Sequence, residues 1–288
     1  MRIDQLLVHI QLASTRSQAQ RLIADGVEWL QGDTWKRIAK NGDDVPEGAS
    51  VRLLNNAEAR YVSRGGLKLE AALARVGLNV KGMACLDVGQ STGGFTDCLL
   101  QHGAVSVVGV DVGSAQLHPQ LRTDPRVLCV EKVNARALEA ADLIAAYEDS
   151  VGSDGMFDAD DDSTLPNSDE AALATASEFV PAFDLVVGDL SFISQTLVLP
   201  AVVPLLKAGG TLLTLVKPQF ELQPGQVGKG GIVKDASMYL LVEQRLRDAY
   251  ADLGLTVTAW FDSPIAGGDG NHEFFICAHK PAETAISD

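Results

Sequence analysis

The sequence has no uninterrupted apolar stretch of 18 or more residues, so it lacks the signal of a membrane-spanning helix. Its first residues, Met1-Arg-Ile-Asp-Gln-Leu-Leu, also lack the apolar core and small-residue cleavage site of a secretory signal peptide. With 46% apolar residues over 288 positions, the chain still has enough apolar material for one large or two unequal domains. We therefore expect a cytoplasmic globular protein that does not associate with membranes.

Cysteine is scarce, and no two of the cysteines form a C-x-x-C pair. Disulfide frameworks and zinc sites need cysteines at short, repeated spacings. Three of the four lie in or beside apolar runs. We expect reduced, buried thiols and no metal site, at Cys85, Cys98, Cys129 and Cys277.

Basic residues are also few, because 23 Lys and Arg stand against 38 Asp and Glu, for a net charge of −15. Such a balance argues against a nucleic-acid partner. Ten of the acidic residues, however, lie between Glu148 and Glu178, where there is no Lys or Arg, and without that stretch the net charge is −5. We expect residues 149–177 to form a disordered, acidic surface insertion. An acidic docking site is the alternative.

Residues 1–55 have the pattern of a small α+β unit. Helices are expected over 2–8 and 15–26, and strands over 27–30 and 50–54. Ser14 or Thr15 is expected to cap the second helix, and Gly26 lies just past its end. The unit resembles the α-L RNA-binding domain first described in a ribosomal small-subunit protein, through Arg2, Asp4, Leu7, Ser14, Arg16, Ala19, Leu22, Ile23 and Gly26.

The resemblance weakens after Gly26, where Val27-Glu-Trp-Leu-Gln-Gly-Asp33 replaces the usual Val-x-Val-Asn-Gly hairpin. RNA affinity depends largely on phosphate contacts, and this unit is close to neutral. The RNA-binding residues implied are Arg2, Arg16 and Arg21, together with Arg64 of the next domain. A dimerisation or docking module is the alternative interpretation of this unit.

A linker over residues 56–62 leads to a second domain over residues 63–280, with a tail over 281–288. Ser63 is expected to cap a helix that carries Lys68 in its first turns. After it, strand and helix signals alternate, which is typical of a doubly wound α/β sheet. Strands are expected over 84–88, 105–110, 126–130, 183–189, 210–216, 255–261 and 273–278, and a long helix over 237–253.

The first of these strands runs into a glycine loop, Gly89-Gln-Ser-Thr-Gly-Gly94, and then into an apolar helix pattern. Glycines let backbone N–H groups approach a ligand, and the helix N-terminus favours negative charge. The loop is not the G-x-G-x-x-G of dinucleotide-binding proteins, which counts against a NAD-linked enzyme. A second glycine-rich stretch, residues 224–233, lacks the Ser or Thr that follows the lysine in a Walker sequence.

Polar residues fall at the carboxyl ends of four strands, where ligands of open α/β sheets bind. These residues are Asp87, Asp111, Asp189 and Lys217. Four in one domain favour a binding cleft, because a buried charge without a partner is costly. An acidic residue that ends the second strand, as Asp111 does, suits ribose hydroxyls, so the loop and Asp111 together predict an adenosine-type ligand.

Several blocks in this order resemble one family over nearly the whole chain. They are Ser63-Arg-Gly-Gly-Leu-Lys-Leu, Asp189-Leu-Ser-Phe-Ile-Ser, Leu215-Val-Lys-Pro-Gln-Phe-Glu, Val227-Gly-Lys-Gly-Gly-Ile-Val and Asn271-His-Glu. The chain is similar to the hemolysin-A-like (TlyA-type) rRNA 2′-O-methyltransferases, whose catalytic domain is similar to FtsJ-type RNA methyltransferases. The resemblance implies a Rossmann-like class I methyltransferase sheet, mostly parallel with an antiparallel last strand, with a small N-terminal α+β RNA-binding domain.

The resemblance also implies S-adenosylmethionine as the cofactor, ribosomal RNA or ribosomal subunits as the partner, and cytidine as the target. Carried over residue by residue, the family's catalytic tetrad falls on Lys68, Asp189, Lys217 and Glu273. The cofactor-binding residues implied are Asp87, Gly89, Ser91, Thr92, Gly93, Gly94, Phe95, Asp111, Asn134 and Asp189. Gln90 stands where the family loop usually has a small residue, and we expect it to crowd the methionine end of the cofactor.

The chemistry of 2′-O-methylation accounts for two lysines and two carboxylates. A ribose hydroxyl attacks a sulfonium methyl group only as its proton is removed, and a lysine serves as base when burial and a second ammonium lower its pKa towards ~7–8. We assign Lys217 as the general base and Lys68 as the second cation. Asp189 is expected to orient Lys217, and Glu273 to position both lysines. A catalytically inactive RNA- or ribosome-binding protein and a membrane-active hemolysin are the alternative functions.

Overall fold

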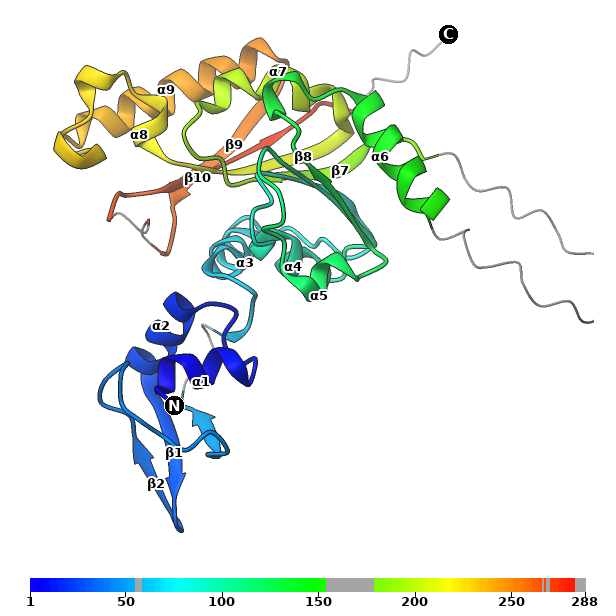
Figure 1. The fold of residues 1–288 in the computed structure, drawn as a ribbon. Coiled ribbons are helices and arrows are strands. Elements are labelled where there is room, and N and C mark those ends of the chain that lie inside the picture. The colour runs from blue at the N-terminus through cyan, green and yellow to red at the C-terminus, as the bar shows by residue number, and fades with distance from the viewer. Residues whose placement is uncertain (55–58, 154–178, 266, 268–269, 283–288) are drawn as a thin grey trace, which may run out of the picture.

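The structure is a computed structural model, and it describes residues 1–54, 59–153, 179–265, 267 and 270–282. Within these residues the chain forms a small three-stranded sheet and a large seven-stranded sheet (Figure 1). The small sheet has the strand order β2-β1-β3, and the large sheet has the order β6-β5-β4-β7-β8-β10-β9. The chain thus divides its elements between a small N-terminal unit and a larger α/β unit.

The N-terminal unit packs two helices beside its sheet. Its elements are α1 (Ile3–His9), α2 (Arg16–Gly26), β1 (Val27–Gln31), β2 (Thr34–Arg37) and β3 (Val51–Leu53). Thr15 caps α2, because its side chain accepts a hydrogen bond from the backbone N–H of Gln18. Strand β2 was not expected from the sequence; it pairs antiparallel with β1 across a turn at residues 32–33. Ile3, Leu6 and Leu22 are almost fully buried in the core of this unit.

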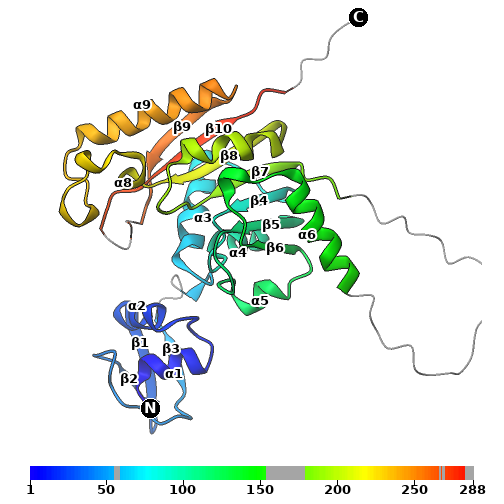
Figure 2. The same cartoon turned by 45° about the horizontal axis from the view of Figure 1, so that its top comes forward.

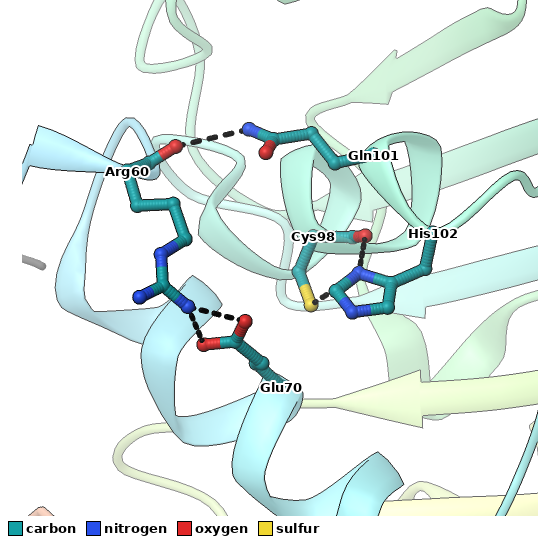
Figure 3. Close-up of polar contacts among 5 residues, drawn as sticks. All are labelled: Arg60, Glu70, Cys98, Gln101 and His102. Atoms are coloured by element: carbon teal, nitrogen blue, oxygen red, sulfur yellow. Dashed lines mark hydrogen bonds and ion pairs between the residues drawn. The ribbon is translucent and has the colours of Figure 1, made fainter.

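The segment that follows the linker is held on the α/β unit by polar contacts. The guanidinium of Arg60 lies 2.5 and 2.6 Å from the two carboxylate oxygens of Glu70, and the side chain of Gln101 donates to the carbonyl of Arg60 at 3.0 Å (Figure 3). The carboxylate of Asp97 accepts from the backbone N–H of Val62 at 2.8 Å. From the N-terminal unit, the amide of Gln18 donates to the carbonyl of Tyr61 at 3.2 Å, so both units contact this segment.

The large sheet is parallel except for β10, which pairs antiparallel with both β8 and β9. The expected Rossmann-like sheet with an antiparallel last strand is therefore confirmed. The strands are β4 (Ala84–Val88), β5 (Ser106–Asp111), β6 (Val127–Glu131), β7 (Phe183–Gly188), β8 (Leu206–Val216), β9 (Thr256–Asp262) and β10 (Phe274–His279).

Helices cover both faces of this sheet (Figure 2). Helices α3 (Arg64–Val76), α4 (Gly94–Gln101) and α5 (Pro119–Arg122) pack on one face. Helices α6 (Ala140–Ser153), α7 (Leu199–Val202) and α9 (Ser237–Asp252) pack on the other, and α8 (Pro218–Glu221) follows β8. The buried strands alternate between the faces: Cys85 of β4 joins the α3–α4 core and Leu86 joins the α6–α9 core.

Three expectations differ from the structure. Helix α6 continues to Ser153, so the first residues of the expected 149–177 insertion are helical, and residues 154–178 lie outside the described residues. Ser63 occupies the N-cap position of α3, but its side chain makes no capping hydrogen bond. Strand β8 begins at Leu206 rather than at residue 210, because the chain pairs with β7 already at its start.

The four cysteines are free thiols, and three of them are buried. Burial raises the pKa of the Cys85 and Cys98 thiols to about 12. Over the residues that the structure describes, no helix combines the length and the apolar character that crossing a membrane requires.

Candidate active site

The glycine loop lies at the carboxyl edge of the large sheet, between β4 and α4. Gly89 has a φ of +86°, and a Cβ atom at this position would lie 2.9 Å from the carbonyl oxygen of Asp189. Only glycine meets both conditions without strain. The carboxylate of Asp111, at the end of β5, accepts from the backbone N–H of Ser91 at 2.8 Å and from that of Gly113 at 2.7 Å. Asp111 therefore ties the loop to the next strand end.

Two adjoining cavities open at this edge. The larger, of about 470 Å³, is lined by Asp111, Asn134, the apolar side chains of Val112, Val133, Ile193 and Val198, and others. The smaller, of about 160 Å³, extends to Ser63 and Gly65 at the start of α3 and to Lys217. Gly89, Ser91, Asp189 and Ser191 line both cavities, so the two form one cleft with an apolar end and a charged end.

Eight of the ten expected cofactor-binding residues line this cleft: Gly89, Ser91, Thr92, Gly94, Phe95, Asp111, Asn134 and Asp189. Gly93 is not among the lining residues; a Cβ at Gly93 would meet Leu121 of α5 at 2.4 Å, and its φ is +91°. The glycine is thus needed where α5 packs on the loop.

Asp87 also lies outside the lining of the cleft. Its side chain is buried beneath the loop, and its Oδ2 accepts from the hydroxyl of Thr96 at 2.7 Å. Within the described part of the chain, its other oxygen has no hydrogen-bond partner. Burial raises the pKa of Asp87 to about 7, since the charged form is poorly solvated there.

Gln90 is accommodated differently from the expectation that it crowds the cleft. Its side chain is only 4% exposed, and its Nε2 donates to the hydroxyl of Thr96 at 2.9 Å. A Cβ at Gly109 of β5 would lie 2.0 Å from the amide carbon of Gln90, so the absence of a side chain at Gly109 makes the room that Gln90 fills. Gln90 contributes to the lining of the smaller cavity, while its amide end is held between Thr96 and Gly109.

Two ion pairs join residues that are distant in sequence. One lies in the lining of the cleft and the other is buried outside that lining: Lys217 with Asp189, and Lys68 with Glu273. Lys68 in the second turn of α3 pairs with Glu273, which immediately precedes β10, and the two side chains are 8% and 3% exposed. Lys217, directly after β8, lies 2.5 Å from the carboxylate of Asp189, directly after β7. The Nζ of Lys217 also donates to the hydroxyl of Ser191 at 2.8 Å.

The two pairs share one electrostatic environment. Burial raises the pKa of Glu273 above its ordinary value; Lys68 opposes this shift most strongly, Asp189 adds to it, and Lys217 opposes it. Because Glu273 interacts with the other three groups, the four charges act together and sum to zero. Lys217 and Asp189 thus line the charged end of the cleft. The buried Lys68–Glu273 pair does not line the cleft, but Glu273 lies close enough to interact with both of them.

The basic residues expected to bind RNA lie outside the cleft. Arg2 and Arg16 both pair with the buried carboxylate of Asp4, at 2.9 and 3.0 Å, while about half of each arginine side chain remains exposed. These pairs hold the pKa of Asp4 at about 2. Arg21 lies on α2, and Arg64, partly exposed, is the first residue of α3.

Ser191 and Phe192 belong to the site although the sequence did not single them out individually. Phe192 is 90% exposed with a φ of +64°, and its ring lies 5.0 Å from that of Phe220. An exposed aromatic residue in a strained backbone conformation beside a cleft is uncommon. The sequence signal for these two residues was the Asp189-Leu-Ser-Phe-Ile-Ser block, which follows the end of β7 and contains them both.

Comparisons with known proteins match both units. The FtsJ-like methyltransferase family matches residues 61–280, and the S4 domain family matches residues 1–26. TlyA of Mycobacterium tuberculosis, a 16S/23S rRNA (cytidine-2′-O)-methyltransferase, is 36% identical over 290 residues, which cover 99% of this chain and 92% of that protein. YqxC of Bacillus subtilis, a candidate rRNA methyltransferase, is 38% identical over 98% of this chain and 86% of its own length.

A solved structure extends the similarity to the fold. A candidate hemolysin from Streptococcus thermophilus superimposes with a TM-score of 0.66 at 36% identity, over 100% of this chain and 92% of that one. The similarity spans the N-terminal unit, the large sheet and the cleft together.

Proposed function

This chain belongs to the FtsJ-like methyltransferase family, and on that premise we propose that it transfers a methyl group from S-adenosylmethionine to a ribose 2′-hydroxyl of ribosomal RNA. Cytidine is the proposed target, since the Mycobacterium tuberculosis relative is named for cytidine. We propose that residues 1–55 bind the RNA and that residues 63–280 catalyse the methyl transfer. Ribosomal RNA as the substrate implies that the protein works in the cytoplasm.

The observation that carries this proposal is the Lys217–Asp189 ion pair in the lining of the cleft, together with the buried Lys68–Glu273 pair that interacts with it. Methylation of a ribose hydroxyl needs a proton acceptor, a hydrogen-bond donor that holds the hydroxyl, and groups that position both. Lys217, Lys68 and the two carboxylates supply these parts within one electrostatic environment. A lysine in the lining of a nucleoside-sized cleft, with a second lysine in the same electrostatic environment, favours this chemistry over a simple binding function.

The cleft suits S-adenosylmethionine in shape and polarity. The apolar end offers Val112, Val133 and Ile193 to an adenine ring. Asp111 lies where ribose hydroxyls need acceptors, and the glycine loop, whose Gly89 lines both cavities, offers its backbone to the methionine portion. When bound, the cofactor supplies an electrophilic methyl group.

The chain's own residues then handle the hydroxyl. Lys217 accepts the 2′-hydroxyl proton at Nζ once its ammonium has released a proton to solvent, and Asp189 and Ser191 hold that nitrogen at 2.5 and 2.8 Å. Lys68 donates a hydrogen bond to the hydroxyl oxygen, and Glu273 fixes Lys68. The shielding of Lys68 and Glu273 from water strengthens their mutual attraction.

The N-terminal S4 domain is the proposed docking site for the RNA. Asp4 pairs with both Arg2 and Arg16 and so holds them next to each other on the surface of the N-terminal unit. About half of each arginine side chain is exposed and can bind phosphates. Because each arginine already has a carboxylate partner, we expect modest RNA affinity with a strong dependence on salt.

The test compares rRNA methylation by the wild type, Lys217→Ala and Lys207→Ala. Lys207 is a matched control, because it pairs with Asp184 at 2.7 Å at the start of β8, at the opposite end of the strand from Lys217. We expect ribose methylation by the wild type and Lys207→Ala, and a loss of at least ~100-fold in Lys217→Ala. Binding of S-adenosylmethionine, measured by calorimetry, should be retained by all three proteins.

Equal methylation by the wild type and Lys217→Ala would refute the assignment of the base. An absence of ribose methylation by a wild type that binds the cofactor would instead support a catalytically inactive RNA-binding protein.

A further inference from the structure

Two loops bring Lys217 and Asp189 together, and a buried carboxylate that takes no part in the proposed proton transfer joins these loops. Glu221 is the last residue of α8, four positions after Lys217, and it is 2% exposed. Its Oε2 accepts from the hydroxyl of Ser194 at 2.5 Å, and its Oε1 accepts from the backbone N–H of Gln195 at 2.8 Å. The side chain therefore joins the segment after β8 to the segment after β7.

The loop from Asp189 to Ser194, which Glu221 holds at its end, is only partly buried. None of the six residues from Asp189 to Ser194 is buried, and Phe192 within it is strained at a φ of +64°. Leu190 and Ile193 pack against the core of the large sheet but stay partly buried, so hydrophobic burial fixes this loop less firmly than it fixes the strands. The polar contacts of Glu221 with Ser194 and Gln195 therefore contribute more to holding the loop in this conformation.

Gln195 extends the connection into the sheet. Its Nε2 donates to the carbonyl of Leu215 at 2.8 Å, and its Oε1 accepts from the hydroxyls of Thr214 and Tyr250 at 2.8 and 3.2 Å. Thr214 and Leu215 lie on β8 just before Lys217. The loop end is thus anchored both before Lys217, through Gln195, and after it, through Glu221.

We propose that Glu221 is a positioning residue for methyl transfer, which holds the Asp189–Ser194 loop against the turn of Lys217 and so sets the Lys217–Asp189 distance. The proposal rests on the proposed function, because it acts through the base assigned there. Both partners of the Lys217 ammonium, Asp189 and Ser191, belong to the loop that Glu221 fixes. Release of the loop end therefore moves both partners of the base at once.

Burial of a carboxylate costs free energy unless hydrogen bonds and nearby charges compensate for the lost water. Burial raises the pKa of Glu221, while its hydrogen bonds to Gln195 and Ser194 and the charge of Arg245 oppose that shift. Arg245 of α9 also donates to the backbone carbonyl of Glu221 at 2.6 Å, so the end of α8 is held from the other side as well. Both oxygens of the carboxylate are thus engaged by the segment that follows β7.

The experiment uses the full chain and compares the wild type with Glu221→Ala, Glu221→Gln and Tyr250→Phe. Glu221→Ala removes both acceptors. Glu221→Gln keeps an amide oxygen that accepts from the backbone N–H of Gln195. Tyr250→Phe is the matched control, because it removes one hydroxyl from the far end of the same buried network and leaves the loop contacts of Glu221 intact. Each protein is measured for kcat and KM on rRNA, for the dissociation constant of S-adenosylmethionine, and for Tm.

We expect kcat of Glu221→Ala to fall about 10–100-fold, since misplacement of a catalytic group by about 1 Å costs about that much. The dissociation constant of S-adenosylmethionine should change by less than about threefold, because Asp111 and the glycine loop are untouched. Glu221→Gln should recover most of kcat. Tyr250→Phe should lower Tm and leave kcat within about twofold of the wild type.

An unchanged kcat in Glu221→Ala, with an active wild type, would overturn the positioning role alone. An equal loss of kcat in Tyr250→Phe would overturn it too, because the effect would then follow general destabilisation. A wild type without ribose methylation would refute the proposed function, and the positioning role with it, before any variant is compared.

Discussion

The contact between Lys68 and Glu273 separates the contribution of the site to stability from its contribution to activity. The two side chains are 8% and 3% exposed and come from α3 and the start of β10, so they join elements about 200 residues apart in the chain. We consider the single substitutions Lys68→Met and Glu273→Leu and the double variant that carries both. Each replaces a charged group by an apolar one of similar size.

The expected loss of stability in the single variants follows from the burial of the pair. Removal of one partner leaves the other charge buried and without its counter-ion, which costs about 3–5 kcal/mol. For a domain of this size such a loss lowers Tm by about 10 °C. The double variant leaves no charge to bury, and replacement of a whole buried pair by apolar residues is neutral or stabilising. Its stability should therefore be close to that of the wild type, while its methylation is abolished.

The assay is urea unfolding followed by circular dichroism, analysed as a double-mutant cycle, with rRNA methylation measured on the same samples. We expect both single variants to be destabilised and the double variant to be folded and inactive. A double variant as unstable as the sum of the two singles would show that the pair does not govern the stability of this region. A folded double variant with wild-type activity would refute the part assigned to Lys68.

Two further outcomes are expected. Gly109→Ala should lose about 1–3 kcal/mol of stability, because its Cβ would lie 2.0 Å from the side chain of Gln90. Adding Gln90→Ala to the same chain should restore most of the lost stability. Thermal unfolding of the single and double variants measures both effects. The N-terminal unit should lose stability in acid through Asp4, whose pKa is lowered from 3.8 to about 2 by Arg2 and Arg16. The stabilisation by a carboxylate with a lowered pKa is complete above pH 3.8 and disappears as pH falls towards 2. The stability of Asp4→Asn should therefore fall less steeply in that pH window than the stability of the wild type. Identical acid-unfolding profiles would contradict this expectation.

Much of the large domain could be predicted because its strands are continuous apolar runs. Val107, Val108 and Val110 make β5 recognisable, and the polar residues at the strand ends mark the cleft edge. Strand β2 was missed because Thr34-Trp-Lys-Arg37 shows no regular alternation and is mostly exposed. Its place in the sheet depends on pairing with β1, which local sequence does not encode.

Some contacts of the site could not be predicted for a related reason. The sequence analysis assigned Asp189 to Lys217 and Glu273 to both lysines. That Glu273 forms its ion pair with Lys68 depends on how α3 and β10 meet. The room for Gln90 is made by Gly109 on the neighbouring strand. Likewise, Glu221 looked like part of a motif, and its contacts with Ser194 and Gln195 became visible only once the two loops were placed together.

The most direct test of the central claim is the position of the transferred methyl group. Ribosomal RNA lacking the modification is incubated with the protein and S-adenosylmethionine that carries a deuterated methyl group, digested to nucleosides and analysed by mass spectrometry. We expect the label on the ribose of cytidine, as 2′-O-methylcytidine, and no label with Lys217→Ala. A label on a nucleobase, or a ribose label of equal intensity with Lys217→Ala, would contradict the proposed function.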